Sequence, residues 1–126
     1  MTITQTVTIR AGANQIYDAL TAAKAFAEFT GAPAEISQQV GGEFSCFGGQ
    51  VTGRQIELRP NLRIVQAWRV SSWPEAIYST VKFDLEQAGT STNVTLEHSE
   101  FPEDAEAHLA SGWHKMYWEP LKRYLE

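Results

Sequence analysis

Three histidines and one cysteine are the most reactive side chains of this sequence, but their spacing does not indicate catalysis or metal binding. His108 and His114 are six residues apart, about 240° around a helix, so they cannot bind one ion from a shared face. No cysteine or histidine cluster has the spacing of a zinc site. Cys46 has no neighbouring base or positive charge to activate its thiol. We therefore expect no catalytic residue, no metal and no cofactor.

Two glycine pairs, Gly41–Gly42 and Gly48–Gly49, raise the possibility of a phosphate-binding loop. Neither pair is followed by Lys-Ser or Lys-Thr, and no helix is expected to begin after either of them, so both known phosphate-loop mechanisms are missing. Glycine pairs that flank a short strand are typical of turns. The sequence therefore predicts two turns here.

Large aromatic side chains are the remaining candidates for a functional role. Trp113 and Tyr117 are four residues apart and share one face of a predicted helix. Tryptophan and tyrosine each combine an apolar ring with one hydrogen-bonding group, which suits an amphipathic ligand. Plain core packing is the competing interpretation, because aromatic residues dominate the cores of small domains. Trp118 is predicted to point away from the face that Trp113 and Tyr117 share.

The elements that must position these rings are strands followed by one long helix. Alternating apolar and polar residues predict strands over residues 2–10, 43–47, 50–58, 62–70, 77–85 and 92–98. Two short helices are expected between the first two strands, the second of them capped by Thr21. The segment 105–125 has the pattern of an amphipathic helix. Its apolar residues are Leu109, Trp113, Met116, Tyr117, Leu121 and Tyr124.

Consecutive strands joined by tight turns predict an antiparallel sheet, one face of which must be covered. Only the terminal helix is long enough, since roughly 20 residues span about 30 Å. Pro120 removes one backbone hydrogen bond inside this helix, so a bend is expected between Met116 and Pro120. A curved sheet that holds a helix often leaves a cavity between the two. The sequence therefore predicts an α+β protein with a pocket.

Composition and charge narrow the function classes. The chain has 126 residues, which suits one domain over 1–126, and a net charge of −5, which argues against nucleic-acid binding. No apolar run reaches the roughly 20 residues of a membrane span, and the first residues lack the pattern of a signal peptide. A lone cysteine permits no internal disulfide. We expect a cytoplasmic protein. No pattern defines its oligomeric state.

Several motifs in a fixed order resemble the bacterial activator of heat-shock-protein ATPase homologues. They lie at residues 29–36, 40–45, 47–49, 60–69, 112–114 and 117–121, within a similarity that runs from the first strand to the last residue. This family is similar to the steroidogenic-acute-regulatory (START) lipid-transfer domains and the birch-pollen-allergen fold, the helix-grip (SRPBCC) superfamily. The resemblance implies a curved antiparallel sheet of six to seven strands around a long C-terminal helix. It also implies a hydrophobic ligand in the cavity or a chaperone partner.

We expect a non-enzymatic helix-grip domain that binds a small hydrophobic molecule or lipid between the sheet and the terminal helix. The alternative is a co-chaperone-like interaction module that stimulates a heat-shock chaperone ATPase. A small enzyme would need paired carboxylates, for which Glu43, Glu57 and Glu119 are the residues expected near the cavity rim. The candidate ligand-binding residues are Phe44, Cys46, Trp68, Phe83, Leu109, Trp113, Met116 and Tyr117.

Overall fold

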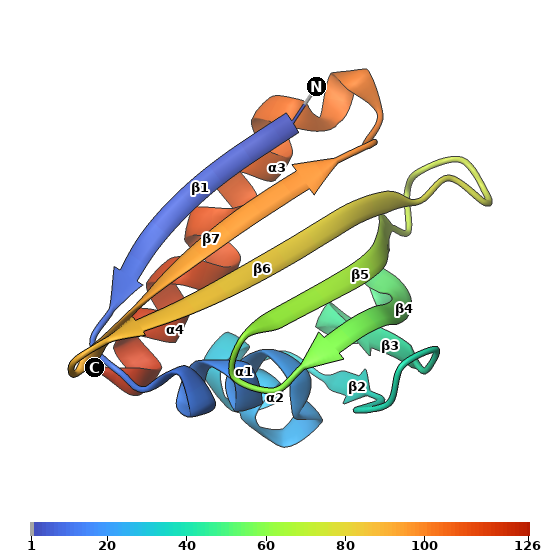
Figure 1. Ribbon diagram of the computed structural model, residues 1–126. Helices are drawn as coiled ribbons and strands as arrows, with labels where there is room; N and C mark the ends of the chain where they lie inside the picture. Colours follow the sequence, from blue (N-terminus) through green and yellow to red (C-terminus); the bar gives the residue numbers. More distant parts are fainter. Residues whose placement is uncertain (1) are drawn as a thin grey trace.

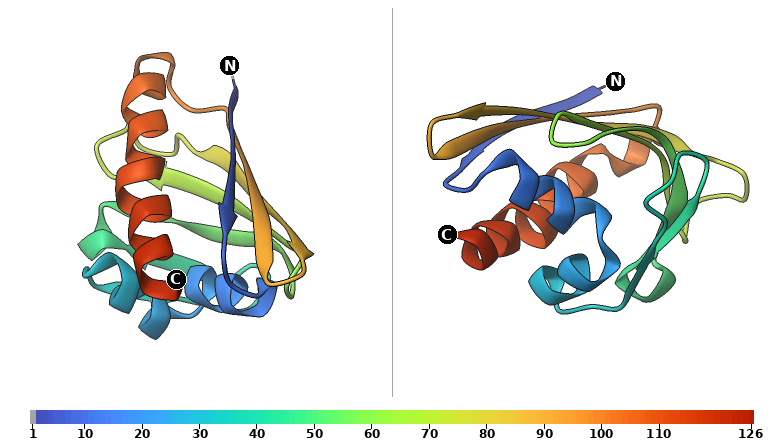
Figure 2. Two further views of the ribbon diagram at one scale, coloured as in Figure 1. Left: turned by 90° about the vertical axis from the view of Figure 1, so that its left-hand side faces the viewer. Right: turned by 60° about the horizontal axis from the view of Figure 1, so that its bottom comes forward.

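The computed structural model describes residues 2–126 and contains one seven-stranded antiparallel sheet, with strand order β1-β7-β6-β5-β4-β3-β2. The sheet is curved, and a long C-terminal helix lies in its hollow (Figures 1 and 2). The strands are β1 (Thr2–Ile9), β2 (Ala34–Ile36), β3 (Glu43–Cys46), β4 (Val51–Arg59), β5 (Arg63–Val70), β6 (Ser79–Ala88) and β7 (Ser91–Ser99). This is the helix-grip fold that the sequence predicted.

Alternation of side chains explains which face of the sheet is covered. In β6 and β7, every second residue from Val81 to Leu85 and from Thr92 to His98 is buried, whereas the residues between them are only partly buried or exposed. Chain neighbours β4 to β7 pair as a meander, and β1 closes the edge by pairing with β7. One face of the sheet thus supplies the apolar layer against which the helices pack.

Two short helices, α1 (Ala13–Thr21) and α2 (Ala23–Thr30), close one end of the hollow beside the terminal helix (Figure 2). The predicted cap of α2 is wrong: Ala22 is the N-cap residue, and the Thr21 hydroxyl donates instead to the carbonyl of Tyr17 within α1. Gly31, at φ 74°, ends α2 in the left-handed conformation that glycine adopts without steric cost.

Strand β2 was not predicted, because its three residues show too little alternation to be recognised. It pairs with β3 through the register Ala34 to Cys46 and Ile36 to Phe44. The two glycine pairs do form turns, as predicted: Gly41, Gly48 and Gly49 all have positive φ. The second pair belongs to a short 3₁₀ turn, η1 (Phe47–Gly49), which leads from β3 into β4.

The terminal helix begins after a 3₁₀ turn, η2 (Glu103–Ala105), and runs through α3 (Glu106–Gly112), η3 (Trp113–Trp118) and α4 (Glu119–Leu125). Its middle segment η3 is π-helical, with the amide of Glu119 donating to the carbonyl of His114, five residues earlier. Pro120 follows directly and has no amide hydrogen to donate. A bend was predicted between Met116 and Pro120. The structure has a widened, π-helical turn just before this proline.

The widened turn decides which side chains face the sheet. A π-helical turn contains one more residue than an α-helical turn, so the neighbours Tyr117 and Trp118 both point inward and are 6% and 1% exposed. The prediction that Trp118 points away from the sheet is wrong, because it assumed a regular helix. The Trp118 ring packs edge-on against Phe83 of β6, and its N–H donates to the side-chain oxygen of Gln5 in β1 at 2.8 Å.

Candidate functional site

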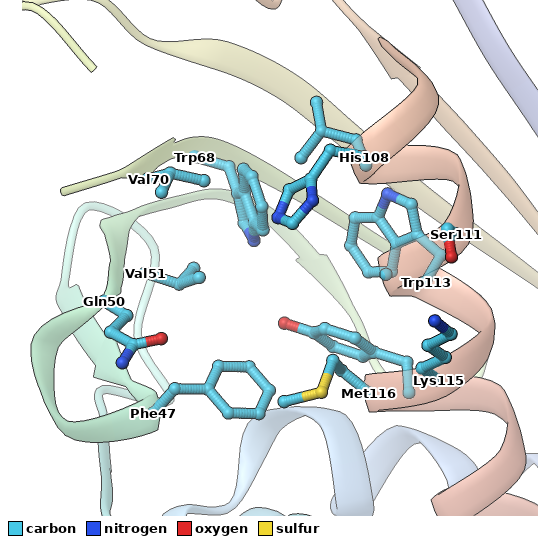
Figure 3. Close-up of a pocket in the computed structure, with 13 residues that line it drawn as sticks. Phe47, Gln50, Val51, Trp68, Val70, His108, Ser111, Trp113, Lys115 and Met116 are labelled. Atoms are coloured by element: carbon cyan, nitrogen blue, oxygen red, sulfur yellow. The ribbon is translucent and has the colours of Figure 1, made fainter. Parts of the chain in front are cut away.

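A cavity of about 360 Å³ lies between the terminal helix and strands β4 and β5, next to η1 (Figure 3). Its volume falls within the range of small-molecule pockets. The sheet and η1 supply one wall, and α3 and η3 supply the other. The lining residues are Phe47, Gln50, Val51, Trp68, Val70, His108, Leu109, Ser111, Gly112, Trp113, Lys115, Met116 and Tyr117.

Five of the eight predicted ligand-binding residues line this cavity. They are Trp68, Leu109, Trp113, Met116 and Tyr117. Met116 is 47% exposed and lies at the opening, whereas the other four are buried and form the inner wall. The prediction that Trp113 and Tyr117 share one face of the helix is confirmed, since their ring centroids are 4.4 Å apart.

The other three predicted residues, Phe44, Cys46 and Phe83, do not line the main cavity. They surround a much smaller void of about 10 Å³, together with Tyr117 and others, which is too small for a ligand. Burial raises the pKa of the Cys46 thiol to about 12, so it remains protonated and unreactive. We regard these three side chains as core residues.

Among the described residues of the inner wall, Trp68 contributes the one solvent-shielded polar atom that makes no hydrogen bond. Its indole N–H points into the cavity (Figure 3) and makes no hydrogen bond to any residue within 2–126, although the side chain is only 4% exposed. Burial raises the pKa of the Tyr117 hydroxyl well above its usual value, and the nearby Cys46 thiol adds to this increase. The nearby N–H of Trp68 partly offsets this increase in the pKa of Tyr117. Its geometry does not, however, make a hydrogen bond to the Tyr117 hydroxyl.

The indole N–H of Trp113, in contrast, has a hydrogen-bond acceptor. Its N–H donates to Nδ1 of His98 at 3.1 Å, so the proton of the neutral imidazole lies on Nε2, 2.8 Å from the Ser79 hydroxyl. That hydroxyl donates to the backbone carbonyl of Trp68 at 2.7 Å. Burial lowers the pKa of His98 to about 4. The Ser79–His98 pair therefore forms a closed structural network, with no free nitrogen to act as a base.

Phe47, Gln50, Val51 and Val70 belong to the cavity wall but were missed in the sequence. They lie in η1, directly after it, at the start of β4 or at the end of β5, and the pairing of Val51 with Val70 brings two of them together. The positive φ of Phe47, 54°, belongs to the η1 turn. The glycines after Phe47 were the available signal, since they mark the turn where strand alternation stops.

The cavity lining includes no carboxylate in a chain whose net charge is −5. The three glutamates expected near the rim lie elsewhere. Glu43 forms an exposed ion pair with Arg54 beside a separate polar hollow, and Glu57 lies within reach of Arg59 and Arg63. Glu119 is exposed on the terminal helix. The lining instead includes Lys115 and His108 from the helix side.

Within the described part of the chain, no group of three or more histidine, cysteine, aspartate or glutamate side chains could hold a metal ion. None of the helices in residues 2–126 is long and apolar enough to cross a membrane.

The curved sheet, the inserted terminal helix and the cavity between them define an α+β protein of the helix-grip class. A family model for "Activator of Hsp90 ATPase homolog 1-like protein" matches residues 10–126, and the chain belongs to this family. The structure is similar to that of an HSP90 activator from Plasmodium falciparum, with a TM-score of 0.92 and 24% identity over 97% of this chain and 94% of that one.

Two further relatives show how the family varies in length. The chain is 25% identical to an Aha1 from Colwellia psychrerythraea, solved as a dimer, with a TM-score of 0.86 over 100% of this chain and 96% of that chain. It is 30% identical over 121 residues to the human activator of 90 kDa heat shock protein ATPase homolog 1, covering 96% of this chain and 36% of that protein. The chain thus spans about a third of the length of the curated relatives it matches.

Proposed function

We propose that this protein is a non-enzymatic binding protein that holds a small apolar molecule between the terminal helix and the sheet. The observation that carries the proposal is the cavity of about 360 Å³, whose inner wall consists of Trp68, Leu109, Trp113 and Tyr117. Burying an apolar molecule against these rings removes its surface from water, which is favourable by about 25 cal/mol per Å² of apolar area.

The buried reactive side chains near the wall support binding rather than catalysis. Among residues 2–126, His98 is the one buried histidine, and it is engaged at both nitrogens. The Cys46 thiol is protonated and lies outside the cavity wall. Neither side chain is placed to act as a nucleophile or a base on a bound molecule. The site therefore supplies shape and apolar contact.

Fluorescence of the apolar reporter N-phenyl-1-naphthylamine would test the proposal, because its emission increases in an apolar site. The wild-type protein should bind it saturably. Val70→Phe, which adds a ring to the cavity wall, should weaken binding at least tenfold. The matched control is Val40→Phe, the same substitution at a residue that is 65% exposed, which should bind like the wild type. Equal binding by both variants would contradict the proposal, provided that both are folded.

A second candidate function, stimulation of a heat-shock chaperone ATPase, is favoured by the names of the relatives. The loop around Trp73 is a candidate surface for such an interaction, but it is only partly available. The Trp73 ring packs on Trp68, with centroids 5.9 Å apart, and Arg69 holds the loop through the carbonyls of Trp73 and Pro74. Ile77 and Tyr78, which follow, are exposed.

An ATPase assay with the purified 90 kDa chaperone would test this second function. If the exposed part of the loop forms the contact, Tyr78→Ala should reduce the stimulation while Val70→Phe leaves it unchanged. No stimulation at any concentration of the wild-type protein would exclude the activity.

A further inference from the structure

The inner end of the cavity contains two hydrogen-bond donors that no protein group uses. The Trp68 N–H is shielded from solvent and makes no hydrogen bond, and the Tyr117 hydroxyl beside it has no carbonyl or carboxylate acceptor within residues 2–126. Both side chains are more than nine-tenths buried, with exposed fractions of 4% and 6%. A buried donor without an acceptor is unfavourable, so the shielded Trp68 N–H indicates a missing acceptor, and the nearby Tyr117 hydroxyl can donate to the same group.

The chemistry of the two groups defines what that acceptor must be. The indole N–H can only donate. The Tyr117 hydroxyl stays protonated because burial raises its pKa well above the usual value, so it too has a hydrogen to offer. A carboxylate is a poor match for this inner end, because burying an anion without a paired cation costs far more than two hydrogen bonds return. Lys115, the one cation of the lining, is exposed on the helix.

We propose that the cavity selects neutral apolar molecules that carry a carbonyl oxygen, which accepts hydrogen bonds from the Trp68 N–H and the Tyr117 hydroxyl. A carbonyl oxygen has two acceptor positions and no hydrogen of its own, so it satisfies both donors and leaves nothing unpaired. This inference depends on the proposed function, since it names the class of molecule that the same cavity binds. The Trp68 nitrogen is shielded from solvent, so a small movement of the side chains around it would bring the ligand oxygen within reach of the N–H.

Two probes of similar shape separate this inference from simple apolar binding. They are 2-acetylnaphthalene, a ketone, and 2-isopropylnaphthalene, a hydrocarbon that differs mainly by replacing the oxygen with a methyl group. Titrating each into ¹⁵N-labelled protein gives both an affinity and the indole N–H signals in one NMR experiment. The ketone should bind about tenfold more tightly, as two modest hydrogen bonds imply.

The tryptophans provide internal controls in the same spectra. The ketone should move the Trp68 indole signal to lower field, because its N–H gains an acceptor. The indole signals of Trp113 and Trp118 should move little, because their N–H groups already donate to His98 and Gln5. The hydrocarbon should not move the Trp68 signal to lower field.

Variants at two tyrosines complete the test. Tyr117→Phe keeps the ring and removes the hydroxyl, so the ratio of the ketone to the hydrocarbon affinity should fall several-fold. Tyr124→Phe is the matched control, because the Tyr124 hydroxyl donates to Glu28 at the surface and is not part of the cavity. It should leave the ratio as in the wild type.

Each outcome bears on the inference. Equal affinity for the two probes, with no low-field shift at Trp68, would overturn the choice of a carbonyl while supporting an apolar binding site. Binding of neither probe would overturn the proposed function and the carbonyl inference together.

Discussion

The apolar layer between the sheet and the terminal helix has two regions that differ in how their indole groups are bonded. In the closed region, over β1, β7 and β6, Trp113 donates to His98 and Trp118 donates to Gln5. In the open region, over β4 and β5, Trp68 has no acceptor within residues 2–126 and borders the cavity. The closed region is thus hydrogen-bonded internally, whereas the open region keeps an unused donor and is where we propose that a ligand binds.

Gln5 shows how the closed region is locked. It interrupts the apolar side of β1 in the sequence, where a polar residue would be costly unless its hydrogen bonds were satisfied. Its side-chain nitrogen donates to the carbonyl of Ala110, and its oxygen accepts from Trp118. One side chain thus joins the first strand to two turns of the last helix. Within residues 2–126, no side chain makes comparable hydrogen bonds across the cavity.

Removal of a tryptophan ring from the closed region should have the largest effect. Trp118→Ala should lower the free energy of unfolding by about 3–5 kcal/mol, because a 1% exposed ring is replaced by an empty space. Met116→Ala, two residues away at the opening of the cavity, should cost much less, because Met116 is 47% exposed. Denaturant unfolding of both variants measures the comparison, and similar losses would show that the two regions contribute alike.

The closed region should also make stability depend on pH. The pKa of His98 is lowered from 6.5 to about 4 in the folded protein, so its contribution is complete above pH 6.5 and is lost as the pH falls towards 4. Between pH 7.5 and 5, the free energy of unfolding should fall by about 2 kcal/mol through this residue.

Two histidine variants isolate this contribution. His98→Gln should be less stable at pH 7.5 but should lose much of the pH dependence. His108→Gln, at an exposed position, should keep the wild-type dependence. A wild-type curve that is flat from pH 7.5 to 5 would contradict the assignment.

Two conservative tryptophan variants compare the regions directly. Trp113→Phe removes the donor to His98 and leaves a buried imidazole nitrogen without a partner, whereas Trp68→Phe removes an N–H that has no partner to lose. Trp113→Phe should therefore be less stable than Trp68→Phe by about 1–2 kcal/mol. Thermal and denaturant unfolding would measure the difference, and a less stable Trp68→Phe would reverse the comparison.

The smallest effect is expected outside both regions, at the polar hollow next to β3. Glu43 and Arg54 form an ion pair at 3.1 Å, but their side chains are 72% and 60% exposed. Glu43→Gln should therefore change the free energy of unfolding by less than about 0.5 kcal/mol. It should not change binding of the naphthalene probes. An effect on probe binding would place the ligand in this polar hollow instead of the cavity beside the terminal helix.

Much of the fold was determined by local patterns in the sequence. Alternation in β6 and β7 fixes which residues face inward, and the glycines at 41, 48 and 49 fix the turns. The amphipathic spacing from Leu109 to Leu121 predicts a helix that must cover a sheet. These signals depend on residues close together in the chain, so they can be read without coordinates.

The cavity itself was decided by contacts between distant segments. The sequence predicted Trp68, Leu109, Trp113, Met116 and Tyr117 as lining residues, but it also predicted Phe44, Cys46 and Phe83, which pack into the core instead. In the sequence, a strand residue that faces a cavity shows the same alternation as a strand residue that is packed into the core. Whether a helix side chain fills the space opposite depends on the register of the helix against the sheet.

That register was set by the π-helical turn before Pro120, which turns Trp118 inward beside Tyr117. The sequence alone determined that a long apolar helix lies on an antiparallel sheet, because periodicity is a property of each segment. Only the tertiary structure decided which buried indole N–H groups within residues 2–126 find acceptors and which buried one remains unbonded. Those partners are contributed by strands far away in the chain, from Gln5 in β1 to His98 in β7.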